Sequence, residues 1–184
     1  MLITITGKAG SGKSTAAKII AEKLGYEYIS IGEMRRKIAD QMGLNIIEFN
    51  KLGELPENQH EFDLKYEEYQ RSLPVDSNIV LESRLGFRCQ PNSFKIFLSV
   101  DDRVAAQRIF EQSRDTDSYA SLEETYETTI RRNNEDIARY QNLYNINYQE
   151  PSNFDLFLDT TGKSTDETVD LMLNIFTQRQ TNHE

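Results

Sequence analysis

The chain has little cysteine, little histidine and no excess of positive charge, and each shortage excludes a class of function. A single cysteine, Cys89, leaves no internal disulfide to form. The 2 histidines, His60 and His183, are isolated and have no second ligand at metal spacing, so the sequence offers neither a zinc site nor a histidine base. With 30 acidic residues against 21 basic ones and a net charge of −9, we expect no surface for nucleic acid.

Long apolar runs are also missing. No segment approaches the roughly 20 apolar residues that a membrane-spanning helix requires. The first residues, MLITITGKAG, enter a strand and a glycine loop without the layout of a signal peptide. We therefore expect a protein of the reducing cytoplasm that binds no membrane. Its 184 residues are within the size range of one compact domain.

Five short apolar segments have the length and composition of buried β-strands, and they are 2–6, 26–31, 78–82, 94–100 and 154–159. Helical patterns separate most of them, at 14–24, in three pieces over 33–73 broken near Gly43 and Pro56, at 101–111 and at 121–144. Because parallel strands need crossover connections, this alternation predicts an α/β fold with a five-stranded parallel sheet between two helical layers. The polar end, 178–184, is expected to fray.

A glycine-rich loop follows the first expected strand and precedes the first expected helix. Residues 7–14, GKAGSGKS, match GxxxxGK[ST], in which glycines let consecutive N–H groups curl around a phosphate. We expect Lys13 to reach the β- and γ-phosphates of ATP and the Ser14 hydroxyl to bind Mg²⁺. The residues expected to hold ATP are Gly7, Lys8, Ala9, Gly10, Ser11, Gly12, Lys13, Ser14 and Thr15.

Charged residues follow two further strands at the same edge of the sheet. Glu82 ends the third strand, where a carboxylate can hold the water shell of Mg²⁺. Arg36 follows the second strand and Arg84 the third. Phosphoryl transfer needs cations around the donor and acceptor phosphates, so we expect these arginines to bind an acceptor that already carries a phosphate. For each arginine alone, a solvated surface position is the competing interpretation.

Together these motifs resemble those of nucleoside monophosphate kinases, and most closely those of archaeal-type cytidylate kinases. The resemblance spans nearly the whole chain and rests on GKAGSGKST (7–15), YISIGEMRRKIAD (28–40), EFNKL (48–52), VLESRL (80–85), RNNEDIARYQNLYNI (132–146) and FDLFLDTT (154–161). It implies a P-loop NTP hydrolase fold with a core of 1–32, 74–107 and 145–178. It also implies a helical flap for the monophosphate at about 33–73, and a lid at about 108–140 that closes over the phosphates and excludes water.

The resemblance also implies roles for single residues. Asp63 would face the pyrimidine and accept a hydrogen bond from the exocyclic amine of cytosine, which separates C from U. The acceptor phosphate would lie among Ser30, Gly32, Arg36 and Arg84. The transferring phosphoryl group would be clamped by Lys13 and by the lid arginines Arg108, Arg132 and Arg139, and Arg114 is expected to substitute for a further lid arginine of the family. We expect a monomeric kinase that uses ATP and Mg²⁺ to phosphorylate a nucleoside monophosphate, with CMP or dCMP as the first candidate.

Several positions depart from the pattern of that family. Ser83 and Glu33 replace a glycine and an aspartate, which are mild changes. Residues 67–69, EEY, stand where the flap helix usually carries an aspartate and two arginines, so two cations are missing and base specificity is open. Gln112 occupies the place of the second lid arginine, and Arg114 is displaced from that place by two positions.

Two other functions fit parts of the sequence. A small-molecule kinase of the shikimate or gluconate type shares the P-loop core, although the segment SRLGFRC lacks the glycine-rich run that shikimate kinases carry after the third strand. An ATP-binding regulator that has lost efficient transfer would fit the missing flap and lid arginines. Tight ATP binding without acceptor-dependent release of ADP would support that second alternative.

Overall fold

A computed structural model describes residues 1–53, 55–58, 60–112 and 119–181. At its centre lies one sheet with the strand order β2-β3-β1-β4-β5, and all of its strand pairs are parallel. The strands are β1 (Ile3–Gly7), β2 (Glu27–Ser30), β3 (Ile79–Glu82), β4 (Phe94–Ser99) and β5 (Leu156–Asp159). The five strands and the parallel sheet predicted from the sequence are therefore confirmed.

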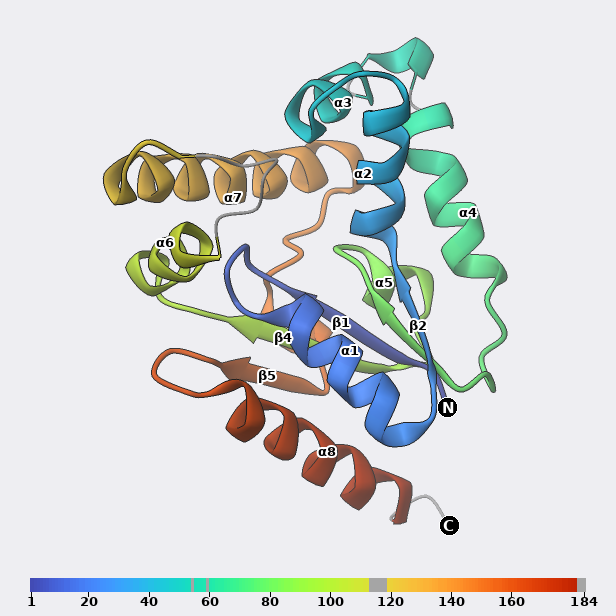
Figure 1. Cartoon of the computed structure of the whole chain (residues 1–184). Coiled ribbons are helices and arrows are strands. Elements are labelled where there is room, and N and C mark those ends of the chain that lie inside the picture. The colour runs from blue at the N-terminus through green and yellow to red at the C-terminus, as the bar shows by residue number, and fades with distance from the viewer. Residues whose placement is uncertain (54, 59, 113–118, 182–184) are drawn as a thin grey trace.

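Helices cover both faces of the sheet (Figure 1). On one face, α1 (Lys13–Leu24) and α8 (Thr165–Thr181) bury Ile20 and Met172 against strand residues such as Ile5. The other face carries α4 (Lys65–Ser72), the short α5 (Gly86–Cys89) and the last turns of α7. This is the predicted three-layer α/β/α arrangement.

The C-terminal helix differs from the sequence prediction. We expected 178–184 to fray, but α8 continues to Thr181 because its apolar side chains are anchored on the sheet. Val169, Met172 and Phe176 are fully buried there and recur at helical spacing. Residues 182–184 lie outside the part of the chain that the structure describes.

The described residues of 33–73 are mostly helical, and the helices are broken near the two predicted points. α2 (Ile31–Gln41) ends before Gly43, which has a φ of 69°, and α3 (Ile46–Gly53) follows. A 3₁₀ turn (Pro56–Asn58) and a π-helical turn (His60–Leu64) then lead into α4. The helix α2 begins where β2 ends because the Ser30 hydroxyl accepts a hydrogen bond of 3.2 Å from the Glu33 N–H.

Two charged helices complete the domain. α6 (Asp102–Glu111) is capped by Asp101, and the 23-residue α7 (Leu122–Tyr144) is capped by Ser121. α7 runs above α6, and its C-terminal half extends toward α2 and α3 (Figure 1). None of the helices in the described ranges is long and apolar enough to span a membrane.

Candidate active site

The glycine-rich loop makes a tight path between β1 and α1. Gly10 has a φ of 73°, and a Cβ atom there would lie 2.7 Å from the Ala105 carbonyl oxygen, so a larger residue would push the loop away from α6. Gly12, with a φ of 81°, directly precedes the first turn of α1. Such left-handed conformations let a loop turn successive N–H groups toward one anion.

The N-terminus of α1 is open to a ligand. In the described part of the chain no side chain caps this helix end, and hydrogen bonds inside the protein use the loop N–H groups of Lys8, Ala9 and Ser11. The first N–H groups of α1 are therefore free to bind an anion, which the positive end of the helix dipole also favours. The loop fits the phosphate site predicted from its sequence.

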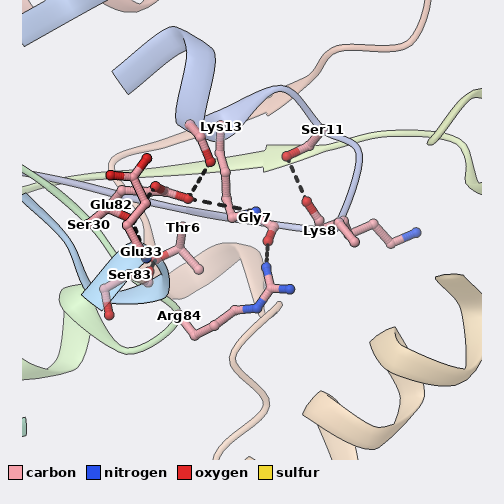
Figure 2. A network of polar contacts seen from close by, with 12 residues as sticks. Thr6, Gly7, Lys8, Ser11, Lys13, Ser30, Glu33, Glu82, Ser83 and Arg84 are labelled. Atoms are coloured by element: carbon pink, nitrogen blue, oxygen red, sulfur yellow. Dashed lines mark hydrogen bonds and ion pairs between the residues drawn. The ribbon is translucent and has the colours of Figure 1, made fainter. Parts of the chain in front are cut away.

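Lys13 and Ser14, at the start of α1, meet Glu82 at the end of β3, and Figure 2 shows Lys13 beside Glu82. The Ser14 hydroxyl donates a hydrogen bond of 2.8 Å to the Glu82 Oε1 atom, and the Lys13 Nζ atom lies 3.9 Å from the same oxygen. The register of the parallel pair, Ile5 opposite Glu82, brings this carboxylate beside the loop. Burial, followed by repulsion from Arg84, lowers the pKa of Lys13 to about 8.

The second oxygen of Glu82 accepts two further hydrogen bonds. Both come from β2, at 2.8 Å from the Tyr28 hydroxyl and at 2.7 Å from the Ser30 hydroxyl. Burial opposes ionisation of Glu82, but the Lys13 cation and the hydroxyl donors outweigh it and hold the pKa of this carboxyl below its usual value. Glu82 is thus a fixed carboxylate beside the Ser14 hydroxyl, and this set of oxygen donors suits a hard cation such as Mg²⁺.

These groups face a cavity of about 680 Å³. Lys8 lies outside its wall, since it pairs with Asp102 at 2.7 Å and points away from Lys13 (Figure 2). Ser30 and Gly7 also do not line the cavity. The Ser30 hydroxyl donates a hydrogen bond to Glu82, and Gly7 is the last residue of β1. The predicted residues that line the cavity are Ala9, Gly10, Ser11, Gly12, Lys13, Ser14, Thr15, Gly32, Arg36, Asp63, Glu82, Arg84, Arg108, Arg132 and Arg139.

Two arginines of this wall have no partner among the described residues. Arg36 comes from α2 and Arg132 from α7, and neither makes a hydrogen bond or an ion pair within the described ranges. Arg132 is close enough to Lys13 to contribute to the lowered pKa of that lysine. Partly buried cations without counter-charges are costly, so their gathering beside a phosphate loop indicates a site for a polyanionic ligand.

Arg84 is already engaged. Its Nε atom donates to Asp136 of α7 at 3.0 Å, and an Nη atom donates to the Gly7 carbonyl (Figure 2). The Tyr148 ring lies 5.9 Å from the guanidinium carbon. To bind an acceptor phosphate as predicted, Arg84 would exchange its carboxylate partner for the phosphate.

Asp63 and Arg139 lie together at the far end of the cavity. One Asp63 oxygen accepts a hydrogen bond of 3.1 Å from Arg35, and the other accepts one from Arg139. Arg139 also donates to the Asn50 carbonyl at 3.2 Å. Arg139, predicted to clamp the transferring phosphoryl group, therefore lies against the helices of the 33–73 region, and Asp63, predicted to face the base, has both oxygens engaged.

Arg108 lies at the opposite end, beside the turn after β5. It donates to the Thr160 hydroxyl at 3.0 Å, to the Thr160 carbonyl at 2.8 Å and to the Lys163 carbonyl at 3.3 Å. It therefore fastens α6 to this turn near the phosphate loop. Gln112 lines the cavity one turn further on, and Arg114 lies outside the described residues.

Sequence reasoning missed several side chains of the site. The contact of Tyr28 with Glu82 could have been predicted, because alternate residues of a strand point to the same side and Tyr28 stands two places before Ser30. Arg35 and Arg36 are adjacent in the sequence. No local pattern indicates that Arg35 pairs with Asp63 whereas Arg36 has no partner among the described residues. Asp136 gave no signal, because its contact with Arg84 depends on which segment α7 packs against.

Several known proteins are similar in sequence to this chain. The family model described as "Cytidylate kinase-like family" matches residues 2–162. A cytidylate kinase from Natronomonas pharaonis is 38% identical over 169 residues, which cover 90% of this chain and 84% of the relative. An S-adenosylmethionine-dependent nucleotide dehydratase from Lacinutrix mariniflava is 34% identical over 174 residues, which cover 93% of this chain and 35% of that longer relative.

Solved structures agree on the fold. A shikimate kinase from Bacteroides thetaiotaomicron matches with a TM-score of 0.58 at 16% identity, over 86% of each chain. A deoxyadenosine kinase from M. mycoides also matches with a TM-score of 0.58, at 17% identity, over 97% of this chain and 100% of the other. The fold is that of the P-loop kinases, and the chain belongs to the cytidylate kinase-like family of phosphotransferases.

Proposed function

We propose that the protein transfers the γ-phosphoryl group of ATP to a nucleoside monophosphate, with CMP or dCMP as the preferred acceptor. The observation that carries the proposal is the pair of unpartnered arginines, Arg36 and Arg132, that line one cavity with Lys13 of the phosphate loop. An enzyme that only hydrolyses ATP does not need cations on both α2 and α7, whereas an enzyme that also binds a second phosphate-bearing substrate does.

The donor end of the cavity supplies the ATP site. Backbone N–H groups of the loop and of the first turn of α1 would bind the phosphates, with Lys13 at the β- and γ-phosphates. Arg108 holds the turn at Thr160 against the loop, which keeps this end of the cavity in shape. Catalysis then rests on positioning and on charge stabilisation, because an acceptor phosphate is already ionised and needs no base.

Mg²⁺ fits the oxygen donors at the junction of α1 and β3. The Ser14 hydroxyl would bind the ion directly, and Glu82 would hold its water shell. The bound ion would supply charge neutralisation between the β- and γ-phosphates. Tyr28 and Ser30 keep the Glu82 carboxylate ionised and oriented for this role.

The acceptor phosphate would enter between α2 and the end of β3. Gly32 permits a close approach to the backbone, with Arg36 beside it. Arg84 is the second expected ligand and would turn from Asp136 to the phosphate. We propose further that the helices over 33–73 act as the acceptor flap and that the region 108–140 closes as a lid. This closure would bring Arg132 to the phosphoryl group that is transferred.

Support for CMP or dCMP as the acceptor comes from the relatives. The cytidylate kinase of Natronomonas pharaonis covers most of this chain at 38% identity. The cavity volume of about 680 Å³ suits two nucleotides that share one phosphate-rich centre.

An acceptor panel tests this function. Release of ADP is measured in a coupled assay with ATP, Mg²⁺ and, in turn, CMP, dCMP, UMP, AMP, GMP and shikimate, and Lys13→Ala serves as the blank. Turnover that depends on CMP or dCMP supports the proposal. Turnover with shikimate alone, or ATP binding that no acceptor converts into ADP release, contradicts it and favours the small-molecule kinase or the regulator.

A further inference from the structure

Asp63 lies between two arginines that come from different helices of the cavity wall. One of its oxygens accepts a hydrogen bond of 3.1 Å from Arg35 of α2, and the other accepts one from Arg139 of α7. The side chains of Asp63 and Arg139 are both 10% exposed, so water screens this contact little. Without the carboxylate, the two guanidinium groups would repel each other. Asp63 therefore joins α2 to α7.

Each of these two helices also carries one of the unpartnered cations of the cavity. Arg35 directly precedes Arg36 on α2. Arg132 and Arg139 are seven residues apart on α7, which corresponds to two helical turns and about 10 Å, so they lie on the same face of that helix. Asp63 is thus linked, through one arginine on each side, to the helices that present both cations.

The link from Asp63 to α2 is held from several directions. Arg35 donates a hydrogen bond of 2.9 Å to the Asn50 side-chain oxygen of α3. Its guanidinium carbon lies 5.2 Å from the centre of the Phe49 ring and 5.2 Å from that of the Tyr66 ring. Because Arg35 is fixed by α3 and α4 as well, it gives the Asp63 carboxylate a fixed orientation toward α7.

α7 takes its position mainly from its C-terminal half. The apolar side chains that pack it on the core lie in its last turns and are Ile137, Tyr140 and Tyr144. The residues buried in its earlier turns are small or polar. Arg139 belongs to the anchored half, and it also donates to the Asn50 carbonyl at 3.2 Å. The contacts of Arg139 therefore help to decide where the same helix places Arg132.

We propose that Asp63 is a positioning residue, which acts through Arg139 to hold α7 against the helices over 33–73 and thereby sets the place of Arg132 relative to Arg36. This inference rests on the proposed function. Transfer requires cations at a fixed spacing around the donor and acceptor phosphates, and a misplacement of about 1 Å can cost roughly a hundredfold in rate. Asp63 and Arg139 then have roles other than those that the family resemblance implies, because neither touches the substrates.

The first test asks whether Asp63 and Arg139 act as one unit. Transfer from γ-³²P-labelled ATP to CMP gives kcat for Asp63→Asn, for Arg139→Gln and for the double variant. We expect each single variant to lose about tenfold in kcat and the double variant to stay within about threefold of them, because all three lack the same contact. If Arg139 instead clamps the phosphoryl group by itself, the two losses multiply, and that result overturns the inference.

The second test asks whether the effect passes through Arg132. In an Arg132→Gln background, Arg139→Gln should change kcat by less than about twofold, because the cation that it positions is already absent. A merely structural role of Arg139 would lower kcat in both backgrounds, so a tenfold loss in the Arg132→Gln background overturns the inference. Wild-type kcat in Arg132→Gln also overturns it. The label keeps transfer measurable even if Arg132→Gln loses about a thousandfold.

Arg131→Gln is the matched control, because it removes the same charge from an exposed position on α7. We expect it to keep the wild-type kcat, and a tenfold loss there would overturn the inference, since any loss of charge on the helix would then suffice. Arg139→Gln leaves Asp63 paired with Arg35, so the second test does not depend on the folding of Asp63→Asn. If the wild type transfers no label to CMP, the proposed function itself is wrong.

Discussion

Arg84, directly after β3, pairs with Asp136 of α7 at 3.0 Å, and this ion pair joins the edge of the sheet to the helix that crosses above it. Both side chains are about one-fifth exposed, so the pair is only partly screened by water. The same guanidinium is one of the expected ligands of the acceptor phosphate. Under the proposed function, the acceptor phosphate would replace Asp136 as the partner of Arg84.

Asp136→Asn tests whether Arg84 meets the acceptor. We expect the free energy of unfolding to fall by about 1–2 kcal/mol, because a partly buried arginine loses its carboxylate. The rise in Tm caused by CMP should become larger than in the wild type, because the acceptor phosphate restores the lost counter-charge. Thermal unfolding with and without CMP measures both effects.

Glu135→Gln is the control for that experiment, because it makes the same change of charge on the same helix at a residue without an ion pair among the described residues. It should leave the Tm and the CMP-induced rise close to the wild-type values. An unaltered CMP-induced rise in Asp136→Asn would remove Arg84 from the acceptor site.

The lowered pKa of Lys13 predicts a pH dependence. Burial and the Arg84 cation bring the pKa to about 8, so Lys13 in the free protein loses its charge as the pH rises through that value. Because the phosphates need the cation, kcat/KM for ATP should fall roughly tenfold per pH unit above about 8. The unfolded lysine keeps its proton up to about 10.5, so this group makes the fold more stable over the same range.

The titration of Lys13 therefore does not itself destabilise the fold as the pH rises from about 8 to 10.5. The residual activity of Lys13→Arg should lack the fall, because a guanidinium stays charged. A wild-type profile that is flat to pH 9.5 would show that the Lys13 charge is not titrating.

Tyr28→Phe is expected to weaken the metal site selectively. The variant removes the hydrogen bond of 2.8 Å to Glu82, which is worth about 1 kcal/mol. The Mg²⁺ concentration for half-maximal activity should rise about fivefold, while kcat at saturating Mg²⁺ stays within twofold. Tyr26→Phe, just before the same strand, makes the same chemical change away from Glu82 and should alter neither value. Equal Mg²⁺ requirements in the two variants would contradict the role of Tyr28.

Asp63→Asn separates the two roles considered for that carboxylate. Both of its oxygens are bound by arginines and its side chain is 10% exposed, so the free energy of unfolding should fall by about 3 kcal/mol. The ratio of kcat/KM for CMP to that for UMP should stay within about twofold. Asp40→Asn, an exposed position on α2, is the stability control. A collapsed CMP preference in a stable Asp63→Asn would assign base recognition to Asp63, as the family resemblance implied.

Much of the fold could be predicted because its signals are local. A five-residue apolar strand, a loop with glycines at left-handed positions and an open helix N-terminus follow from consecutive residues 2–24. The helix breaks near Gly43 and Pro56 were also predictable from these two residues alone. The position of Glu82 beside Ser14 followed from the rule that parallel strands end at one edge of the sheet.

The partners of the arginines could not be predicted. Asp63 and Arg139 lie 76 residues apart, and Arg84 and Asp136 lie 52 apart, so their pairing depends on how α7 crosses the domain. Helical periodicity predicts which residues share a face of a helix, but it does not predict which other element packs against that face. For the same reason the sequence could not tell which arginines remain free to bind phosphate.

The central claim is transfer of phosphate to a monophosphate, and the most direct measurement follows the label from [γ-³²P]ATP in the presence of Mg²⁺ and CMP. The account predicts that the label appears in CDP, that inorganic phosphate forms far more slowly, and that Lys13→Ala abolishes transfer while the variant remains folded. Label found only in inorganic phosphate, or near-normal transfer by Lys13→Ala, would contradict the account.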